Sequence, residues 1–306
     1  RWGDAIQDAQ PALQRHYQKQ GLESARLDPA CGGYSFWHIV DAASKQGEAY
    51  GANGVFDLFW DVKPNGFTPE ALCLLNGPSA LLLQTDPPDR IAVAGETIKT
   101  AFWISHYGDR RLENAEGCWR LRDGAETLAA GEFAAGPVDL GSTRLLKEIN
   151  LTVPRVAKPL HAMLEVSLRS ADAGVPEIRN QWDFWVFPAC GKRDGAGVCV
   201  SPALKPVLEK QYAGLAVSGS PEAERAILLI ARGGEPEVAR ALETGKRVIV
   251  IHGTEGAPNV KLGWWTMGNQ VGTAFARHPA LGELPHAGHL SPLFFRILKE
   301  GRALPL

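Results

Sequence analysis

The sequence lacks an excess of charge of either sign. Its 306 residues contain 32 Lys and Arg against 34 Asp and Glu, which gives a formal net charge of −2. Surfaces that bind nucleic acid or anionic membranes depend on clustered positive charge, so we expect neither partner. The longest apolar runs, such as 226–231 and 248–251, fall far short of the ~20 residues needed to cross a bilayer. The sequence therefore predicts no transmembrane helix.

Cysteine is scarce as well. Cys31, Cys73, Cys118, Cys190 and Cys199 are spread along the chain, and no two are spaced as C-x-x-C. This spacing argues against a disulfide framework and against a zinc knuckle. For the two nearest neighbours, Cys190 and Cys199, the simplest interpretation is a pair of small buried side chains.

Motifs for nucleotide binding and for serine or cysteine hydrolases are missing too. The turn at 231–234 is not G-x-G-x-x-G, 252–256 is not a Walker loop, and no Ser or Cys lies in a G-x-S-x-G elbow. His278, His286 and His289 match no standard zinc spacing. We therefore expect no cofactor and no bound metal.

What is present divides into three regions with different periodicities. The first, residues 1–78, begins with a pattern typical of helices broken near Gly21 and ended by Pro29. An aromatic and β-branched run at 34–41 then predicts a buried strand, and after a long Gly-rich loop Thr68 has the character of a helix N-cap. Helix, strand, long loop and helix form the local order of a (β/α)8 barrel, of which this region supplies the last βα unit.

The second region, residues 79–190, predicts an immunoglobulin-like β-sandwich. Turn signals separate short strand-like runs at a spacing typical of such sandwiches. The predicted strands are 80–83, 91–93, 98–106, 118–121, 144–153, 161–169 and 181–187. Alternation is clearest at 100–105 and 162–169, where one face is apolar.

The third region, residues 191–306, predicts a small α/β module. Continuous apolar runs at 226–231 and 247–251 flank a helical pattern at 235–243. Such an arrangement is typical of a βαβ unit with buried parallel strands. We expect a flavodoxin-like accessory module with no nucleotide site.

Several of these segments together resemble glycoside hydrolase family 2, the β-galactosidase-like group. The resemblance lies in 21–29, 33–41, 54–63 and 68–70 for the end of the catalytic barrel, 180–188 for the last strand of a following sandwich, and 263–265, 268–272 and 278–282 for a C-terminal module. It implies retaining hydrolysis of a β-glycosidic bond by two Glu residues about 5 Å apart. It also implies that both residues lie on earlier barrel strands.

None of the first region's glutamates suits that role. Glu23 falls within a helical pattern, Glu48 within the long loop, and Glu70 at a helix start. The catalytic pair is therefore expected outside this chain, which is interpreted as a fragment or a processing product. The first residues have no signal-peptide pattern, so any signal peptide is expected to have been removed or to lie upstream. Its expected partners are a carbohydrate substrate and the N-terminal catalytic part of the same protein. Its location stays open, with the periplasm or secretion favoured.

Three residues are the candidates for substrate binding. Trp37, His38 and Asp41 lie at the end of the predicted last strand, where barrel enzymes build their active sites. A Trp ring packs on a sugar face, and carboxylate or imidazole groups bond to hydroxyls. The alternative is that Trp37 and Phe36 are barrel core and that Asp41 caps the following segment. For the whole chain, the alternative function is a noncatalytic carbohydrate-binding or interaction protein.

Other aromatic and acidic residues carry their own expectations. The pairs Trp264/Trp265 and Trp182/Trp185 are either carbohydrate platforms or, as is more usual for neighbouring Trp residues, one ring in the core and one at a domain contact. Asp183, between Trp182 and Trp185, is predicted to form structural hydrogen bonds where regions meet, rather than to catalyse. The apolar segment 34–41 is predicted to pair with strands outside this chain.

Overall fold

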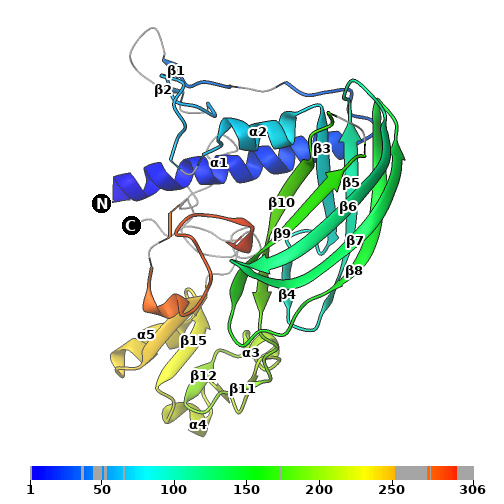
Figure 1. Ribbon diagram of the computed structural model, residues 1–306. Coiled ribbons are helices and arrows are strands. Elements are labelled where there is room, and N and C mark those ends of the chain that lie inside the picture. The colour runs from blue at the N-terminus through cyan, green and yellow to red at the C-terminus, as the bar shows by residue number, and fades with distance from the viewer. Residues whose placement is uncertain are drawn as a thin grey trace. The chain divides into compact units, whose positions relative to one another are not determined.

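The computed structural model describes residues 2–35, 38–43, 50–51, 54–64, 66–171, 174–251, 274–275 and 277–294. Two compact units make up the chain: one spans Arg1–Ala189 and Gly272–Phe295, and the other spans Cys190–Val271 and Arg296–Leu306. The protein is mostly β, with several helices and a β-sandwich (Figure 1). Among the described helices, none has both the length and the apolar character needed to cross a membrane.

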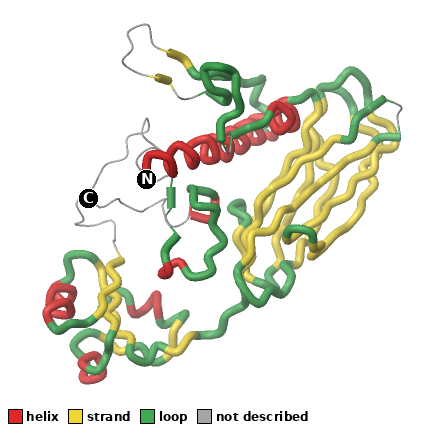
Figure 2. Tube along the Cα trace, turned by 60° about the vertical axis from the view of Figure 1, so that its left-hand side comes forward, coloured by secondary structure: helices red, strands yellow, loops and turns green. Residues whose placement is uncertain are grey.

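Helix α1 (Trp2–Leu27) is the longest element (Figure 2). It runs through Gly21 without interruption, so the predicted break there is wrong. A glycine inside a helix costs only about 1 kcal/mol. The burial of Ala12, Leu13 and Leu22 offsets that cost, because packing of an apolar face stabilises a helix more than its intrinsic propensity does.

The segment after α1 differs from the predicted buried strand. The described residues of 34–41 contain no regular strand, and Tyr34 and Ile39 are exposed. Pairing is limited to a parallel bridge between Val40 and Phe56 and an antiparallel bridge between Phe56 and Val62. The described residues therefore do not form the predicted strand within this chain, because β-propensity yields a strand only where partner edges are present.

Two short strands and a helix follow this segment. The short strands β1 (Ala42–Ala43) and β2 (Tyr50–Gly51) pair antiparallel. Helix α2 (Pro69–Asn76) begins as predicted, with the Thr68 Oγ1 accepting a hydrogen bond from the Ala71 N–H at 3.1 Å.

The sandwich contains two sheets. The strands are β3 (Ser79–Asp86), β4 (Ile91–Val93), β5 (Thr97–His106), β6 (Leu112–Asp123), β7 (Glu126–Val138), β8 (Ser142–Thr152), β9 (Leu160–Arg169) and β10 (Ile178–Phe187). One sheet has the order β3-β5-β8 and the other β4-β10-β9-β6-β7. All pairs are antiparallel except β4 with β10. Strand β7 was not predicted.

The sandwich core follows the predicted alternation. Phe102 and Ile104 on β5 face Leu164 and Leu168 on β9 across the two sheets, and all four are buried. Each strand contributes every second side chain to this core. The opposite side chains of β9 and β10 are polar over most of their length, which leaves one sheet face open to other contacts.

The second unit holds a four-stranded parallel sheet of order β14-β12-β15-β16. The elements of the second unit are β11 (Arg193–Asp194), β12 (Val198–Val200), α3 (Lys205–Leu208), β13 (Tyr212–Ala213), β14 (Ala216–Val217), α4 (Pro221–Glu224), β15 (Leu228–Arg232), α5 (Pro236–Glu243) and β16 (Arg247–Ile251). The predicted βαβ unit, β15-α5-β16, is confirmed. Cys199 is buried as expected, whereas Cys190 is exposed and the burial predicted for it is wrong.

Candidate functional site

The two segments that carry the barrel-end motifs meet at Asp41. Its Oδ1 accepts hydrogen bonds from the Lys63 Nζ at 2.7 Å and from the Gly54 N–H at 2.8 Å. The Lys63 Nζ also donates to the Gly54 carbonyl at 2.7 Å. Only 12% of the Asp41 side chain and 11% of the Lys63 side chain are exposed, so this ion pair is shielded from water. We call these three residues the Asp41 cluster.

Gly54 is required for this close approach. A Cβ atom at this position would lie 2.2 Å from the Asp41 N and 2.3 Å from the Val40 C. Both are backbone atoms that cannot move aside as a flexible side chain would. The backbone also joins the segments through Phe56 N to Ile39 O at 2.9 Å.

The structure describes two of the three predicted substrate-binding residues. Trp37 lies outside the described residues. His38 is half-buried, and its carbonyl accepts a hydrogen bond from the Val55 N–H at 3.3 Å. Asp41 uses its carboxylate within the Asp41 cluster. Substrate binding by all three stays a prediction.

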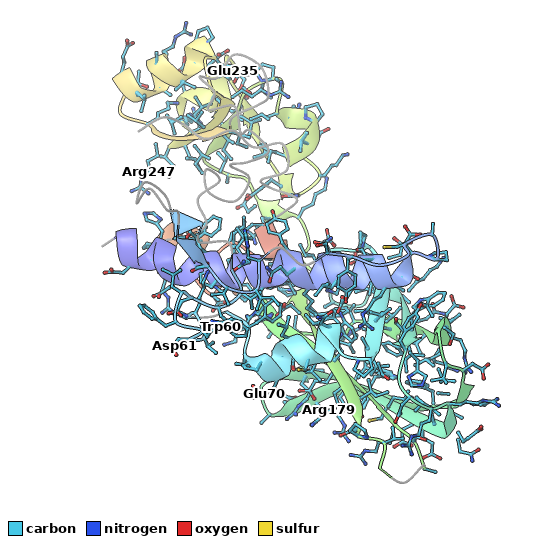
Figure 3. The ribbon with its side chains drawn as sticks, turned by 90° about the horizontal axis from the view of Figure 1, so that it is seen from above. Trp60, Asp61, Glu70, Arg179, Glu235 and Arg247 are labelled. Carbon is cyan, nitrogen blue, oxygen red and sulfur yellow. The ribbon has the colours of Figure 1, made fainter. Side chains whose placement is uncertain are left out.

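An exposed aromatic turn was not anticipated from the sequence. The Asp57 Oδ1 accepts hydrogen bonds from the Phe59 N–H at 2.8 Å and the Asp61 N–H at 2.9 Å. The turn holds Trp60 at a φ of 70°, with 67% of its surface exposed. Figure 3 shows Trp60 and Asp61 on the same side of α1. In the sequence, Asp57 is the residue that could have predicted this turn, because Asp side chains accept hydrogen bonds from the backbone of the residues that follow them.

Helix α1 is joined to the sandwich by a buried polar network. The Lys19 Nζ donates to the Glu23 Oε1 and the Asn180 Oδ1, both at 2.6 Å. Glu23 also accepts from the Trp182 Nε1 and the Asn180 Nδ2, each at 3.0 Å. The Lys19 Nζ lies 4.8 Å from the Trp182 ring centroid. Burial lowers the pKa of Lys19, against the raising effect of Glu23.

Asp183 forms a second contact between α1 and the sandwich. Its Oδ1 lies 2.7 Å from the His161 Nε2 and its Oδ2 3.9 Å from the His16 Nδ1. Burial alone would raise the pKa of Asp183, but the His161 hydrogen bond, with the charges of His16, His161 and Arg90, lowers it to about 2. The predicted hydrogen-bonding role of Asp183 is confirmed. Trp182 belongs to the buried core of the sandwich, and Trp185 is buried with its ring stacked on that of His161. One ring of this pair therefore lies in the core, as expected, while Trp264 and Trp265 lie outside the described residues.

The histidine-rich segment adds a ring contact to this region. The His289 ring lies 6.2 Å from that of His16, centroid to centroid. The His286 ring instead packs edge-on against Phe275 and Phe294. Within the described ranges, no group of three or more His, Cys, Asp or Glu side chains has the arrangement of a metal site.

Comparison with known proteins identifies one family match. The model of a family described as a domain of unknown function (DUF8488) matches residues 96–188, which form most of the sandwich. No curated protein matches this chain.

Several solved structures align with parts of this chain at low identity. The Bacillus subtilis sporulation control protein Spo0M is 9% identical, with a TM-score of 0.29 over 37% of this chain. The Amycolatopsis orientalis exo-chitosanase CsxA is 14% identical, with a TM-score of 0.37 over 56% of this chain. The Parabacteroides merdae β-glucuronidase is 13% identical, with a TM-score of 0.25 over 36% of this chain.

The chain spans only part of these proteins. The matched regions cover 51% of Spo0M, 18% of the exo-chitosanase and 14% of the β-glucuronidase. At these TM-scores the likenesses carry no conclusion about the activity of this chain.

Proposed function

We propose that this chain is the C-terminal portion of a retaining β-glycosidase, with the catalytic Glu pair supplied by a preceding part of the protein. Residues 1–78 would close a (β/α)8 barrel, 79–190 would form an immunoglobulin-like sandwich, and 191–306 would form a flavodoxin-like accessory module. The resemblance of the barrel-end motifs to glycoside hydrolase family 2 suggests the activity. The Asp41 cluster is the structural observation that supports it most.

The Asp41 cluster matters because it joins the two motif segments that the resemblance singles out. Asp41 ends the first, and Gly54 and Lys63 bound the second. A shielded ion pair is costly to form unless its geometry is well satisfied, so the arrangement specifies how the chain leaves and re-enters this region. Trp37 and His38 lie four and three residues before Asp41, and in this proposal they bind the sugar.

Exposed apolar side chains beside the cluster support a missing packing partner. Ile39 is 48% exposed, Phe59 82% and Val62 46%. Grouped apolar residues on a surface mark an interaction site more often than a free face. We propose that earlier barrel strands cover them and pair with 34–41.

The strand orders support the assignments of the other two regions. In the sandwich, the connections β5–β6, β7–β8 and β8–β9 each join strands of different sheets, and such Greek-key connections between two sheets are typical of immunoglobulin-like domains. In the second unit, the sheet order is β14-β12-β15-β16. In chain order β12 is the first strand of this sheet and β14 the second, so the second strand lies at the edge, next to the first. That order is typical of flavodoxin-like sheets.

An activity assay tests this proposal. The complete gene product and the 306-residue chain are each incubated with a panel of aryl β-glycosides. We expect the complete product to release aglycone with retention at the anomeric carbon, and the chain alone to give no turnover, because double displacement requires both carboxyl groups. Turnover by the chain alone, abolished by substituting one of its own Glu residues, would overturn the proposal. So would a complete product that contains no barrel, which would favour a noncatalytic carbohydrate-binding protein.

A further inference from the structure

A broad hollow lies on the outer face of the β4-β10-β9-β6-β7 sheet. It has a volume of about 930 Å³, within the range of small-molecule sites. Side chains from four strands line it, and Figure 1 shows these strands side by side. The register places Arg120 opposite Glu165, and Glu165 opposite Gln181. Two residues further along the same pair of strands, Cys118 lies opposite Ser167.

The hollow carries both signs of charge in equal number. Its lining includes four arginines and four glutamates: Arg120, Arg122, Arg169, Arg179, Glu116, Glu132, Glu165 and Glu177. Some of them neutralise each other, since Arg122 lies 3.5 Å from Glu165 and Glu177 lies 2.9 Å from Arg169. Arg179, labelled in Figure 3, also reaches Glu177, at 3.5 Å.

Three charged groups in the hollow are left for a ligand. Within the described residues, Arg120, Glu116 and Glu132 form no ion pair or hydrogen bond through their side chains. The Arg122 Nε is buried and also has no hydrogen-bond partner there. Spare donors and spare acceptors therefore lie together on one surface.

This inventory selects among ligand classes. An anion would meet Glu116 and Glu132, and a cation would meet Arg120, so either would face repulsion. A purely apolar ligand would cover these charged side chains without pairing them, which is costly, and the one aromatic ring of the lining, Phe133, stacks on Phe102 at 5.8 Å. A neutral polyol suits the surface, since each hydroxyl both donates and accepts and bonds to charged groups are the stronger ones.

We propose that the hollow is a noncatalytic binding site for a neutral oligosaccharide. It would hold a glycan chain across β10, β9 and β6, with Arg120 donating to hydroxyl oxygens and Glu132 accepting from hydroxyl groups. The choice of carbohydrate among neutral polyols rests on the proposed function. The hollow would then hold substrate chains on the sandwich, apart from the Asp41 cluster.

Calorimetric titration of the 306-residue chain tests this. The probes are neutral oligosaccharides of several linkages, with a polyuronate and a chitosan oligomer as charged counterparts. The double variant R120A/E132A removes one cation and one anion from the hollow. The double variant K99A/E148A does the same on the exposed face of the other sheet, so the two match in net charge.

We expect at least one neutral oligosaccharide to bind, with affinity unchanged by salt. R120A/E132A should weaken it at least about tenfold, as expected for losing two charge-assisted hydrogen bonds, and K99A/E148A should change it less than about twofold. Three results would overturn the proposal: no neutral oligosaccharide binds the folded chain, R120A/E132A binds as wild type does, or only a charged polymer binds with salt-dependent affinity. Because the titration measures binding by the 306-residue chain and the aryl-glycoside assay measures turnover by the complete gene product, either proposal can fail alone.

Discussion

The Lys63 Nζ lies 2.7 Å from the Asp41 Oδ1, although the two residues are 22 positions apart in the sequence. Between them the chain leaves and returns to the same point, and the Gly54 N–H and carbonyl complete the contact. The pair therefore fixes the segment whose motifs resemble a glycosidase barrel end.

Replacing Lys63 by Met tests how much this pair stabilises the segment. K63M leaves a shielded carboxylate without its cation, which typically costs about 3 to 5 kcal/mol. The free energy of local opening, measured by hydrogen exchange at the Gly54 amide, should fall by a similar amount. Because D41N/K63M removes both charges, we expect it to be less destabilised than K63M.

The exposed pair of Arg110 and Asp109 is the control for this prediction, and R110M should change stability by less than about 1 kcal/mol. Equal effects of K63M and R110M would contradict the shielded character of the pair.

Gly54→Ala tests the backbone approach itself. The added methyl would lie 2.2 Å from the Asp41 N, so Asp41 and Gly54 have to separate and their hydrogen bond is lost. We expect a destabilisation of at least about 2 kcal/mol, in the range of backbone incompatibilities. Gly32→Ala is the matched control, because no atom lies within 4 Å of its added Cβ. Thermal unfolding of both variants compares them, and a G54A midpoint equal to that of G32A would refute the steric argument.

The sequence predicted the fold best where the pattern concerns the residues of a single strand. Alternation at 162–168 was enough to assign the buried face of β9, because successive side chains of a strand point to opposite sides. Strand β7 was missed because its sequence around Ala129–Ala135 is rich in Ala and Gly, residues with low β-propensity. Its place in the sheet comes from pairing with β6, a long-range contact that local propensity does not encode.

The candidate site was predicted less well for the same reason. The aromatic run at 34–41 has the composition of a strand, but a strand forms only beside partners. Asp41 was singled out for its acidic side chain, while its partner Lys63 was assigned no role. The contact between Asp41 and Lys63 depends on how the chain folds between them, and no periodic pattern in the sequence predicts it.

Glu23→Ala tests the network that joins α1 to the sandwich. The substitution removes the acceptor for the Lys19 Nζ, the Asn180 Nδ2 and the Trp182 Nε1. The Lys19 Nζ keeps the Asn180 Oδ1 and the Asn180 Nδ2 keeps the Leu81 carbonyl, so only the Trp182 Nε1 is left without a partner, which costs about 1 to 3 kcal/mol. The shielded Lys19 ammonium also loses its counter-charge, which adds to that cost. We expect E23A to lower the free energy of unfolding by about 3 kcal/mol or more, measured in urea. Glu126→Ala, at an exposed position of β7, should change it by less than about 0.5 kcal/mol, and a similarly small effect of E23A would show that α1 does not depend on this network.

The contact between α1 and the sandwich should also depend on pH through His16. Burial lowers the pKa of His16 from 6.5 to about 4, against the raising effect of Asp183 and with the help of Arg15, His289 and Arg90. Between these two values the unfolded chain binds the proton and the folded chain does not. The free energy of unfolding therefore falls as the pH decreases from about 6.5 to about 4, with a slope of up to about 1.4 kcal/mol per pH unit from this group.

His16→Gln removes this titration. Urea unfolding of the wild type and of H16Q, measured at intervals from pH 7.5 to pH 4, should give a shallower dependence for the variant, by a total of about 3 kcal/mol over the range. The comparison stops at pH 4 because Asp183 adds its own dependence below that point. Its pKa of about 2 lies below the ordinary 3.8, so the stability it contributes is lost only as the pH falls from about 3.8 towards 2. Identical slopes for the two proteins above pH 4 would mean that His16 is solvated in the folded protein, and that α1 does not pack on the sandwich at Asp183 as the structure describes.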